Sequence, residues 1–149
     1  MKSRQLSGSM EDYLEAILVL QNENSQAKVA RAKEISEKLD VKMSSVTNAL
    51  KQLSEKGYIN YDRYSYITLT EKGESYAEEI HFRHTTLTEF LEKTLGIDPD
   101  KAEDNACRME HIMDKEVITR IAAFNDYMKR KGEVVDLGIF IEECEKKGS

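Results

Sequence analysis

The chain has 149 residues, of which 40% are hydrophobic and 34% charged, with one proline and no tryptophan. This composition is that of a folded, helix-rich protein of one ordinary domain or two small ones, and it excludes a disordered chain. No apolar run approaches the ~18 residues of a membrane-spanning helix, the N-terminus lacks an apolar signal segment, and two cysteines make no disulfide framework. We therefore expect a cytoplasmic protein with reduced thiols and no membrane partner.

The negative charge is concentrated in the C-terminal half of the chain. Residues 1–73 carry 11 lysines and arginines against 10 aspartates and glutamates, a net charge of +1. Residues 74–149 carry 11 lysines and arginines against 18 aspartates and glutamates, a net charge of −7, so the whole chain has a net charge of −6. A near-neutral half can bind DNA only if its basic residues gather on one face. The acidic half would repel DNA and attract cations.

The apolar spacing of residues 9–20 predicts the first helix. Ser9, followed by Asp12, gives its start a pattern typical of an N-terminal cap. Asp12 and Glu15 stand three positions apart on the more polar side. Acids near a helix N-terminus are favoured by the helix dipole alone, so this pair by itself indicates no ligand.

Two short helices, residues 31–39 and 44–53, are separated by a tight turn over residues 40–42, which predicts a helix-turn-helix. The second helix opens with small polar side chains of the kind that contact base edges and phosphates in a major groove. The alternative is a capped surface helix, because serine and threonine cap helices in any protein. The residues predicted to contact DNA here are Lys42, Ser44, Ser45, Thr47, Asn48 and Lys51.

A β-hairpin is predicted after this second helix. Gly57 ends the helix, residues 58–61 and 66–70 alternate as strands, and the turn between them carries Arg63. Helix, helix and hairpin in this order form a winged helix-turn-helix. We therefore predict a DNA-binding domain over residues 1–73, with Arg63 at the wing tip reaching a phosphate or the minor groove.

Residues 74–149 are predicted to form an all-helical second domain. A long helix covers residues 74–95 and carries His81 and His84, and further helices are expected over residues 100–113, from Asp114 to Gly132, and in the tail. A helical histidine is most often a surface or packing residue. Cys144 has no ligand-type neighbour except acids, so we interpret it as a packing thiol.

A thiol, a carboxylate and an imidazole share one helix face in the second domain, because Cys107, Glu110 and His111 stand at i, i+3 and i+4. Glu103 lies one turn earlier on the same face. These ligand types suit Fe(II), Mn(II), Co(II), Ni(II) or Zn(II) better than Mg or Ca. The alternative is a buried cysteine beside a surface glutamate that pairs with Arg108 or Lys115.

Over about residues 7–130 the chain resembles the diphtheria-toxin-repressor/manganese-transport-regulator family of metal-activated transcriptional repressors. Four motifs in the right order and spacing are more specific than any one alone. The motifs are Ser9–Ile17, Ser44–Thr47, Arg83–His84 and Ala106–Met113, the last followed by Glu116 and Val117.

The resemblance implies a mainly α homodimer that represses metal-uptake genes. An N-terminal winged helix would be followed by a helical dimerisation domain, without an SH3-like third domain, and the dimer would bind a pseudo-palindromic double-stranded operator. The implied cofactor is Mn(II) or Fe(II), with Co, Ni or Zn possible in vitro, held at the junction of the domains so that it sets the spacing of the recognition helices. The implied metal ligands are Asp12, Glu15, His84, Cys107, Glu110 and His111, with Glu103 as a further oxygen ligand.

The implied site combines two branches of the family. Cys107 matches the iron branch, where the manganese branch has a glutamate, and Asp12 matches the manganese branch, where the iron branch has a methionine. Thr88 and Glu103 stand where the iron branch has a glutamate and a histidine, so an ancillary site is altered. Met43 stands where members often have proline. The resemblance therefore leaves the preference between manganese and iron open.

Two other classes of function compete with this expectation. A winged-helix regulator that senses an organic ligand or a redox state would leave the Cys107-Glu110-His111 cluster structural, although neighbouring acids argue against a reactive thiolate at Cys107. A metalloenzyme would need a nucleophile-base set or a phosphate-binding loop, and the sequence offers neither. We therefore predict a regulator that is not an enzyme and takes no organic substrate.

Overall fold

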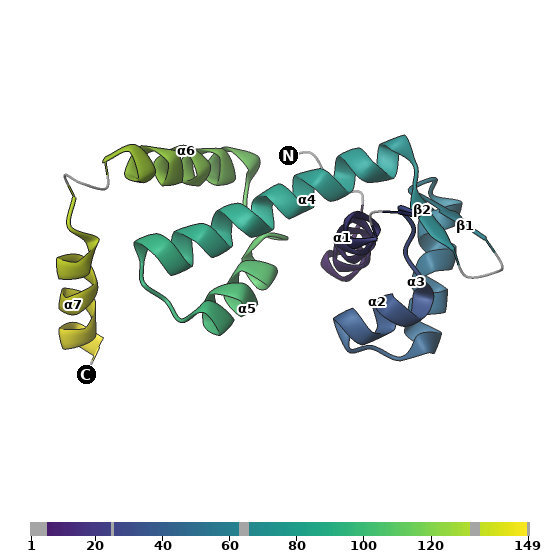
Figure 1. Cartoon of the computed structure of the whole chain (residues 1–149), viewed down its shortest axis with the longest axis horizontal. Coiled ribbons are helices and arrows are strands. Elements are labelled where there is room, and N and C mark those ends of the chain that lie inside the picture. Colours follow the sequence, from purple (N-terminus) through teal and green to yellow (C-terminus); the bar gives the residue numbers. More distant parts are fainter. Residues whose placement is uncertain (1–5, 25, 63–65, 132–134, 149) are drawn as a thin grey trace. The chain divides into compact units, whose positions relative to one another are not determined.

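The computed structural model describes residues 6–24, 26–62, 66–131 and 135–148 (Figure 1). The chain divides into two compact units, Met1–His81 and Phe82–Ser149. The division falls inside one long helix, α4 (Glu71–Glu89), whereas the sequence placed a domain boundary after residue 73, near the start of that helix. The described residues include no helix that is both long and apolar enough to cross a membrane.

The first unit is a winged helix-turn-helix, as predicted. β1 and β2 are antiparallel, with Ile59 opposite Leu69 and Tyr61 opposite Ile67. They are the only strands in the described residues, which therefore contain no SH3-like barrel. The elements before α4 are α1 (Gly8–Glu23), α2 (Ala32–Leu39), α3 (Met43–Glu55), β1 (Ile59–Tyr61) and β2 (Ile67–Leu69).

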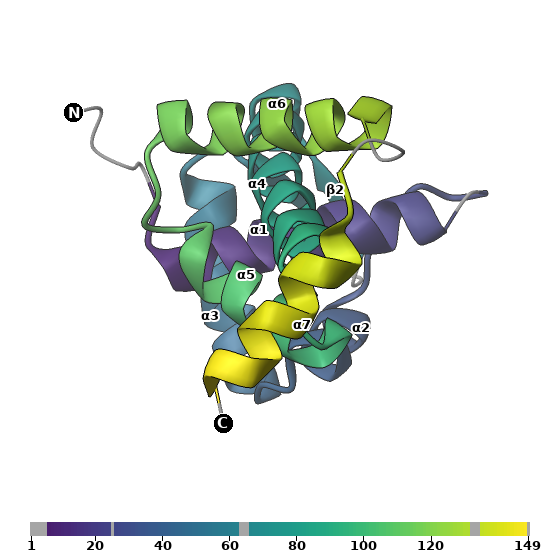
Figure 2. The ribbon, with the colours of Figure 1, turned by 90° about the vertical axis from the view of Figure 1, so that its left-hand side faces the viewer.

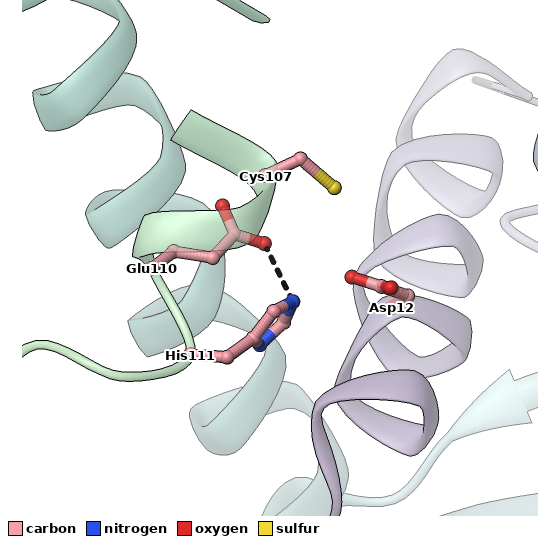
Figure 3. Close-up of side chains that lie close together, drawn as sticks. All are labelled: Asp12, Cys107, Glu110 and His111. Carbon is pink, nitrogen blue, oxygen red and sulfur yellow. Dashed lines mark ion pairs between the residues drawn. The ribbon is translucent and has the colours of Figure 1, made fainter. Parts of the chain in front are cut away.

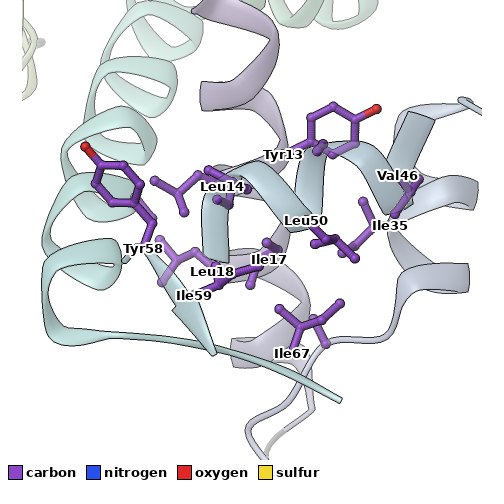
Figure 4. Close-up of a cluster of buried hydrophobic side chains, with 14 of the residues drawn as sticks. Tyr13, Leu14, Ile17, Leu18, Ile35, Val46, Leu50, Tyr58, Ile59 and Ile67 are labelled. Atoms are coloured by element: carbon purple, nitrogen blue, oxygen red, sulfur yellow. The ribbon is translucent and has the colours of Figure 1, made fainter. Parts of the chain in front are cut away.

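The core of the first unit lies where α1, α2, α3 and the hairpin meet (Figure 4). Its apolar side chains recur at helical spacing on α1 and α3, which is why these segments bury one face each. Full burial of a large aliphatic side chain contributes roughly 1.5–3 kcal/mol, so this cluster is the main stabilising feature of the unit. Its fully buried members include Leu14, Ile17, Ile35, Val46, Leu50, Leu53, Tyr58 and Ile67.

Two helix starts differ from the predicted ones because a residue further upstream supplies the cap. Ser7, not Ser9, caps α1, since its Oγ accepts from the backbone N–H of Met10. Thr70 caps α4, so the helix starts at Glu71 and not at residue 74. The Thr70 hydroxyl oxygen accepts from the N–H of Gly73, and the Thr70 carbonyl oxygen accepts from the N–H of Glu74. Upstream caps satisfy N–H groups that the first turn leaves open.

The second unit is all-helical, as predicted. After α4, a π-helical turn, η1 (Phe90–Thr94), continues the same helix axis, so the predicted 74–95 helix is not regular to its end. α5 (Pro99–Met109) and α6 (Lys115–Lys131) both pack against η1, on different sides of the α4–η1 helix (Figures 1 and 2). The buried core of this unit consists of Leu87, Leu91, Ala102, Ala106 and Ile118.

The tail forms a helix, α7 (Leu137–Gly148), as expected, but Cys144 on it is exposed. The prediction of a packing thiol is therefore wrong. No described residue of α7 is buried, and Ile139 and Phe140 are exposed. A cysteine on a helix with so little buried surface has no core to pack into.

Candidate metal centre and nucleic-acid interface

Three predicted ligands converge at the C-terminal end of α5 (Figure 3). Cys107 lies in the last turn of the helix, Glu110 is its C-cap, and His111 lies in the turn that follows. One ligand atom from each residue, a sulfur, a carboxylate oxygen and a ring nitrogen, lies within 4.8 Å of the other two. The side chain of Glu110 is 1% exposed and that of His111 is 12% exposed. The three side chains that the sequence placed on one helix face therefore lie close together.

The sequence predicted that these three residues lie on one continuous helix over residues 100–113. In the structure only Cys107 lies within the helix. Asp98 caps the start of α5, because its carboxylate accepts from the N–H groups of Asp100 and Lys101. The helix ends at Met109, not at residue 113. In the segment that follows, the Arg83 guanidinium donates to the carbonyl oxygens of residues 110 and 113, at 3.1 and 3.3 Å.

Arg83 is a residue of the site to which sequence reasoning gave no structural role. It lies 27 positions from Glu110, and the only signal was its place beside His84 in a recognised motif. Its two hydrogen bonds fix the backbone from which both Glu110 and His111 project. Arg83 therefore supports two predicted ligands at once.

His84 lies between two carboxylates in the second unit. Its Nδ1 is 2.6 Å from Oε2 of Glu110, and its Nε2 is 2.8 Å from Oε1 of Glu103. The His84 side chain is 12% exposed, whereas that of Glu103 is 61% exposed. The structure thus brings both predicted residues to the cluster, with Glu103 on the solvent side of the imidazole.

These residues fit a divalent transition metal. Glu110 is a carboxylate withdrawn from water, and a buried carboxylate is stable only with compensating positive charge or hydrogen bonds. The groups around it are the nitrogens of His84 and His111 and the thiol of Cys107. Thiolate, imidazole and carboxylate together are the ligands of Fe, Mn, Co, Ni and Zn, whereas Mg and Ca prefer oxygen alone.

The two ligands predicted on the first helix, Asp12 and Glu15, lie on α1 in the first unit. Both are half-buried there, although neither belongs to the apolar stripe of the helix. Acids on the polar side of a helix are normally well hydrated, so their partial burial is a feature that the sequence did not predict.

Glu11, next to Asp12, is a buried acid that sequence reasoning overlooked, with only 3% of its surface exposed. Tyr76 on α4 donates its hydroxyl to Glu11, while the backbone N–H of Leu6 donates to that hydroxyl oxygen. Burial, followed by the charge of Glu11, raises the pKa of Tyr76 to about 12. No local sequence signal distinguishes Glu11 from a surface acid, because its partner is 65 positions away in the chain.

The polar face of α3 forms the candidate nucleic-acid interface. Val46, Ala49 and Leu50 are buried, which turns the opposite side of the helix outward. The predicted DNA-contacting side chains here are all exposed, and the Thr47 hydroxyl donates to the carbonyl of Met43 at 3.0 Å. Arg63, the predicted contact at the wing tip, lies outside the described residues. The exposed set comprises Lys42, Ser44, Ser45, Thr47, Asn48 and Lys51.

Two family models match the chain one after the other. Residues 5–67 match the N-terminal DNA-binding domain of the iron-dependent repressors, and residues 70–133 match their metal-binding and dimerisation domain. The first match contains α1 to α3 and β1 and ends at the first residue of β2, and the second contains α4, α5 and α6. The candidate nucleic-acid interface on α3 thus falls in the match to the DNA-binding domain. The Cys107-Glu110-His111 cluster falls in the match to the metal-binding and dimerisation domain.

Curated relatives resemble the chain over almost their whole length. An uncharacterised HTH-type transcriptional regulator of Methanocaldococcus jannaschii is 40% identical over 126 residues, which cover 85% of this chain and 99% of the relative. The HTH-type transcriptional regulator MntR of Oceanobacillus iheyensis is 36% identical over 140 residues, covering 93% and 92%.

Solved structures share the fold at lower identity. IdeR of T. acidophilum is 26% identical with a TM-score of 0.65, over 87% of this chain and 55% of that one. A manganese-dependent transcriptional repressor in complex with manganese is 27% identical with a TM-score of 0.69, over 79% and 53%. The chain therefore spans about half the length of these two solved chains.

Proposed function

Because the chain belongs to the iron-dependent repressor family, we propose that it switches off metal-uptake genes when it binds Mn(II) or Fe(II). It is a metal-dependent, DNA-binding transcriptional repressor, and the resemblance to the diphtheria-toxin-repressor/manganese-transport-regulator family is confirmed. The identity of the metal and of the regulated genes is the part that we propose. The observation that carries the proposal is the convergence of Cys107, Glu110 and His111 around a carboxylate that is 1% exposed.

We propose that the metal is held by ligands from both units. Cys107, Glu110, His111 and His84 would supply the ligands of the second unit, and Asp12 and Glu15 those of α1. The support is the match of these residue types to the family motif, together with the partial burial of both acids. Several carboxylates gathered without a cation repel one another, and a divalent ion removes that repulsion. Metal binding would then restrain the first unit against the second.

This restraint would connect metal binding to DNA binding. DNA and a second copy of the chain are its partners, as the matched DNA-binding and dimerisation domains indicate. In a dimer, two copies of α3 must enter major grooves about 34 Å apart, so fixing each recognition helix favours binding. We infer a pseudo-palindromic operator, action in the cytoplasm where that DNA lies, and regulation without catalysis or an organic substrate.

The proposal is tested by DNA binding with and without metal. Duplexes are first selected from a random pool by the purified protein under anaerobic conditions, separately with Mn(II), with Fe(II) and with a chelator. Fluorescence anisotropy then gives the affinity for the selected duplex in each condition. We expect tight binding only with metal, loss of binding on chelation, and selected sequences that occur upstream of metal-uptake genes.

Variants show whether the cluster is responsible. Glu110→Ala combined with His111→Ala is expected to remove the metal response, whereas Glu116→Ala, which removes an exposed acid paired with Arg120 on α6, is expected to keep it. Equal DNA binding with and without metal would contradict the proposal. A metal response that survives the double substitution would make the cluster structural, as in a regulator that senses an organic ligand or a redox state.

A further inference from the structure

The imidazole of His84 is held from both sides by carboxylates, but these two carboxylates differ in their surroundings. Glu110 is 1% exposed and lies on the side of Cys107 and His111. Glu103 is 61% exposed and contacts the other ring nitrogen at 2.8 Å. The ring itself is 12% exposed, so a contact on its outer nitrogen can control its orientation.

A carboxylate accepts hydrogen bonds and cannot donate one when ionised. The Glu103 contact at Nε2 therefore places a hydrogen on that nitrogen of His84. By the same argument the contact of Nδ1 with Oε2 of Glu110, at 2.6 Å, also holds a hydrogen, and a metal bound on this side of the ring would take its place, whereas the hydrogen on Nε2 would stay with Glu103. A metal-binding histidine characteristically donates its second N–H to a carboxylate, which fixes both the tautomer and the ring plane.

We infer that Glu103 is a positioning residue, whose carboxylate holds Nε2–H of His84 so that Nδ1 is the nitrogen offered to the metal. This differs from the oxygen-ligand role that the sequence predicted for Glu103. The inference rests on the proposed function, because it assigns a role toward the metal of that same site. The structural basis is a contact of Glu103 with the outer side of the imidazole, opposite the nitrogen that faces Glu110.

Two substitutions separate positioning from ligation. Glutamine retains a side-chain oxygen that accepts from Nε2–H but is a poor metal ligand, whereas alanine removes the acceptor. A positioning role predicts that Glu103→Ala weakens Mn(II) and Zn(II) binding by about 10–100-fold, while Glu103→Gln stays near the wild-type affinity. A ligand role predicts a comparable loss in both variants.

The matched control is Asp104→Ala, which removes an equal charge from the neighbouring exposed position of α5. It is expected to leave metal affinity unchanged, and this separates the Glu103 contact from the acidic field of the domain. Circular dichroism verifies that each variant is folded, which we expect because Glu103 and Asp104 are both exposed.

The NMR signal of the Nε2–H proton of His84 is a measurement that a merely structural role of Glu103 would not change. In the zinc-loaded protein, nitrogen-15 NMR is expected to show His84 bound through Nδ1, with a slowly exchanging Nε2–H. That proton signal should persist in Glu103→Gln and be lost in Glu103→Ala. Zinc bound through Nε2 of His84 in the wild type, or an Ala variant with unchanged affinity and proton exchange, would overturn the inference.

Failure of the inference is distinguishable from failure of the proposed function. If the wild-type protein binds none of these metals, the proposed function fails and Glu103 has no such role. If the wild type binds metal and Glu103→Ala behaves as the wild type, only the assignment of Glu103 fails.

Discussion

The Arg83 guanidinium donates to the backbone carbonyl oxygen of Glu110 at 3.1 Å. The next residue, His84, contacts the carboxylate of the same glutamate at 2.6 Å. Two adjacent side chains of α4 therefore hold both the backbone and the side chain of Glu110. This places the most buried predicted ligand under the control of a helix that begins in the first unit and ends in the second.

Replacing Arg83 should weaken metal binding without unfolding the protein. Arg83→Met keeps the aliphatic part of the side chain but leaves the carbonyls of Glu110 and Met113 without this donor. We expect a loss of about 10–100-fold in metal affinity, as is typical when a group that orients a ligand is removed. Titration calorimetry with Mn(II) measures it. Arg108→Met is the control, because Arg108 bonds only locally on α5 in the described structure, and an equal loss there would contradict the role of Arg83.

Cys107 should contribute a thiolate to the bound metal, whereas Cys144 should not. In the Co(II)-loaded protein, a sulfur-to-metal charge-transfer band is expected in the near-ultraviolet spectrum. Cys107→Ser should abolish this band and weaken Co(II) binding, because oxygen is a harder ligand than sulfur. Cys144→Ser should retain the band, since that cysteine is exposed on α7. A band that survives Cys107→Ser would remove this residue from the ligand set.

Lys51, exposed on α3, should act on DNA through charge alone. Lys51→Ala is expected to weaken binding to all duplexes similarly and to lower the slope of log affinity against log salt by about one. Anisotropy measured over a range of salt concentrations tests this. The control is Lys101→Ala on α5, which should leave the slope unchanged. A loss confined to one sequence would instead indicate base readout by Lys51.

Tyr76 should make the stability of the fold depend on pH in the alkaline range. Its folded-state pKa is raised from 10.0 to about 12 by burial and by Glu11, so its contribution is complete below pH 10 and is lost as the pH rises through 12. Tyr76→Phe should lack this part of the alkaline decline and be less stable at neutral pH by roughly 1–3 kcal/mol, because Glu11 loses a donor.

Urea unfolding of both proteins between pH 9 and 12 measures this difference. Burial also raises the pKa of Tyr58, but Tyr58 is present in both proteins, so the difference between them reports on Tyr76. Parallel stability curves for the two proteins over this range would contradict the role of the Glu11–Tyr76 hydrogen bond.

The winged helix could be predicted because its signals are local. Val46, Leu50 and Leu53 recur at helical spacing and are all buried, and of the residues between them only Ala49 is buried as well. Gly57, with φ +81°, adopts the left-handed conformation that glycine tolerates after a helix. Periodicity and turn chemistry thus determine these elements without knowledge of their neighbours.

The rest of the site depends on contacts between distant positions. The role of Arg83 does not follow from local sequence, since it depends on hydrogen bonds that span 27 and 30 positions. The burial of Glu11 depends on Tyr76 in the same way. Cys144 was misjudged because an apolar helix pattern predicts a buried face only where another element covers it.

The central claim is that metal binding and DNA binding assist each other, and the most direct test measures both directions. The affinity of the protein for Mn(II) is determined with and without the selected duplex, and its affinity for the duplex with and without Mn(II). Reciprocal coupling requires the two affinity ratios to be equal, and typical coupling lies at about 5–150-fold. Equal ratios in this range would support the account, and a Mn(II) affinity that does not change when DNA is bound would contradict it.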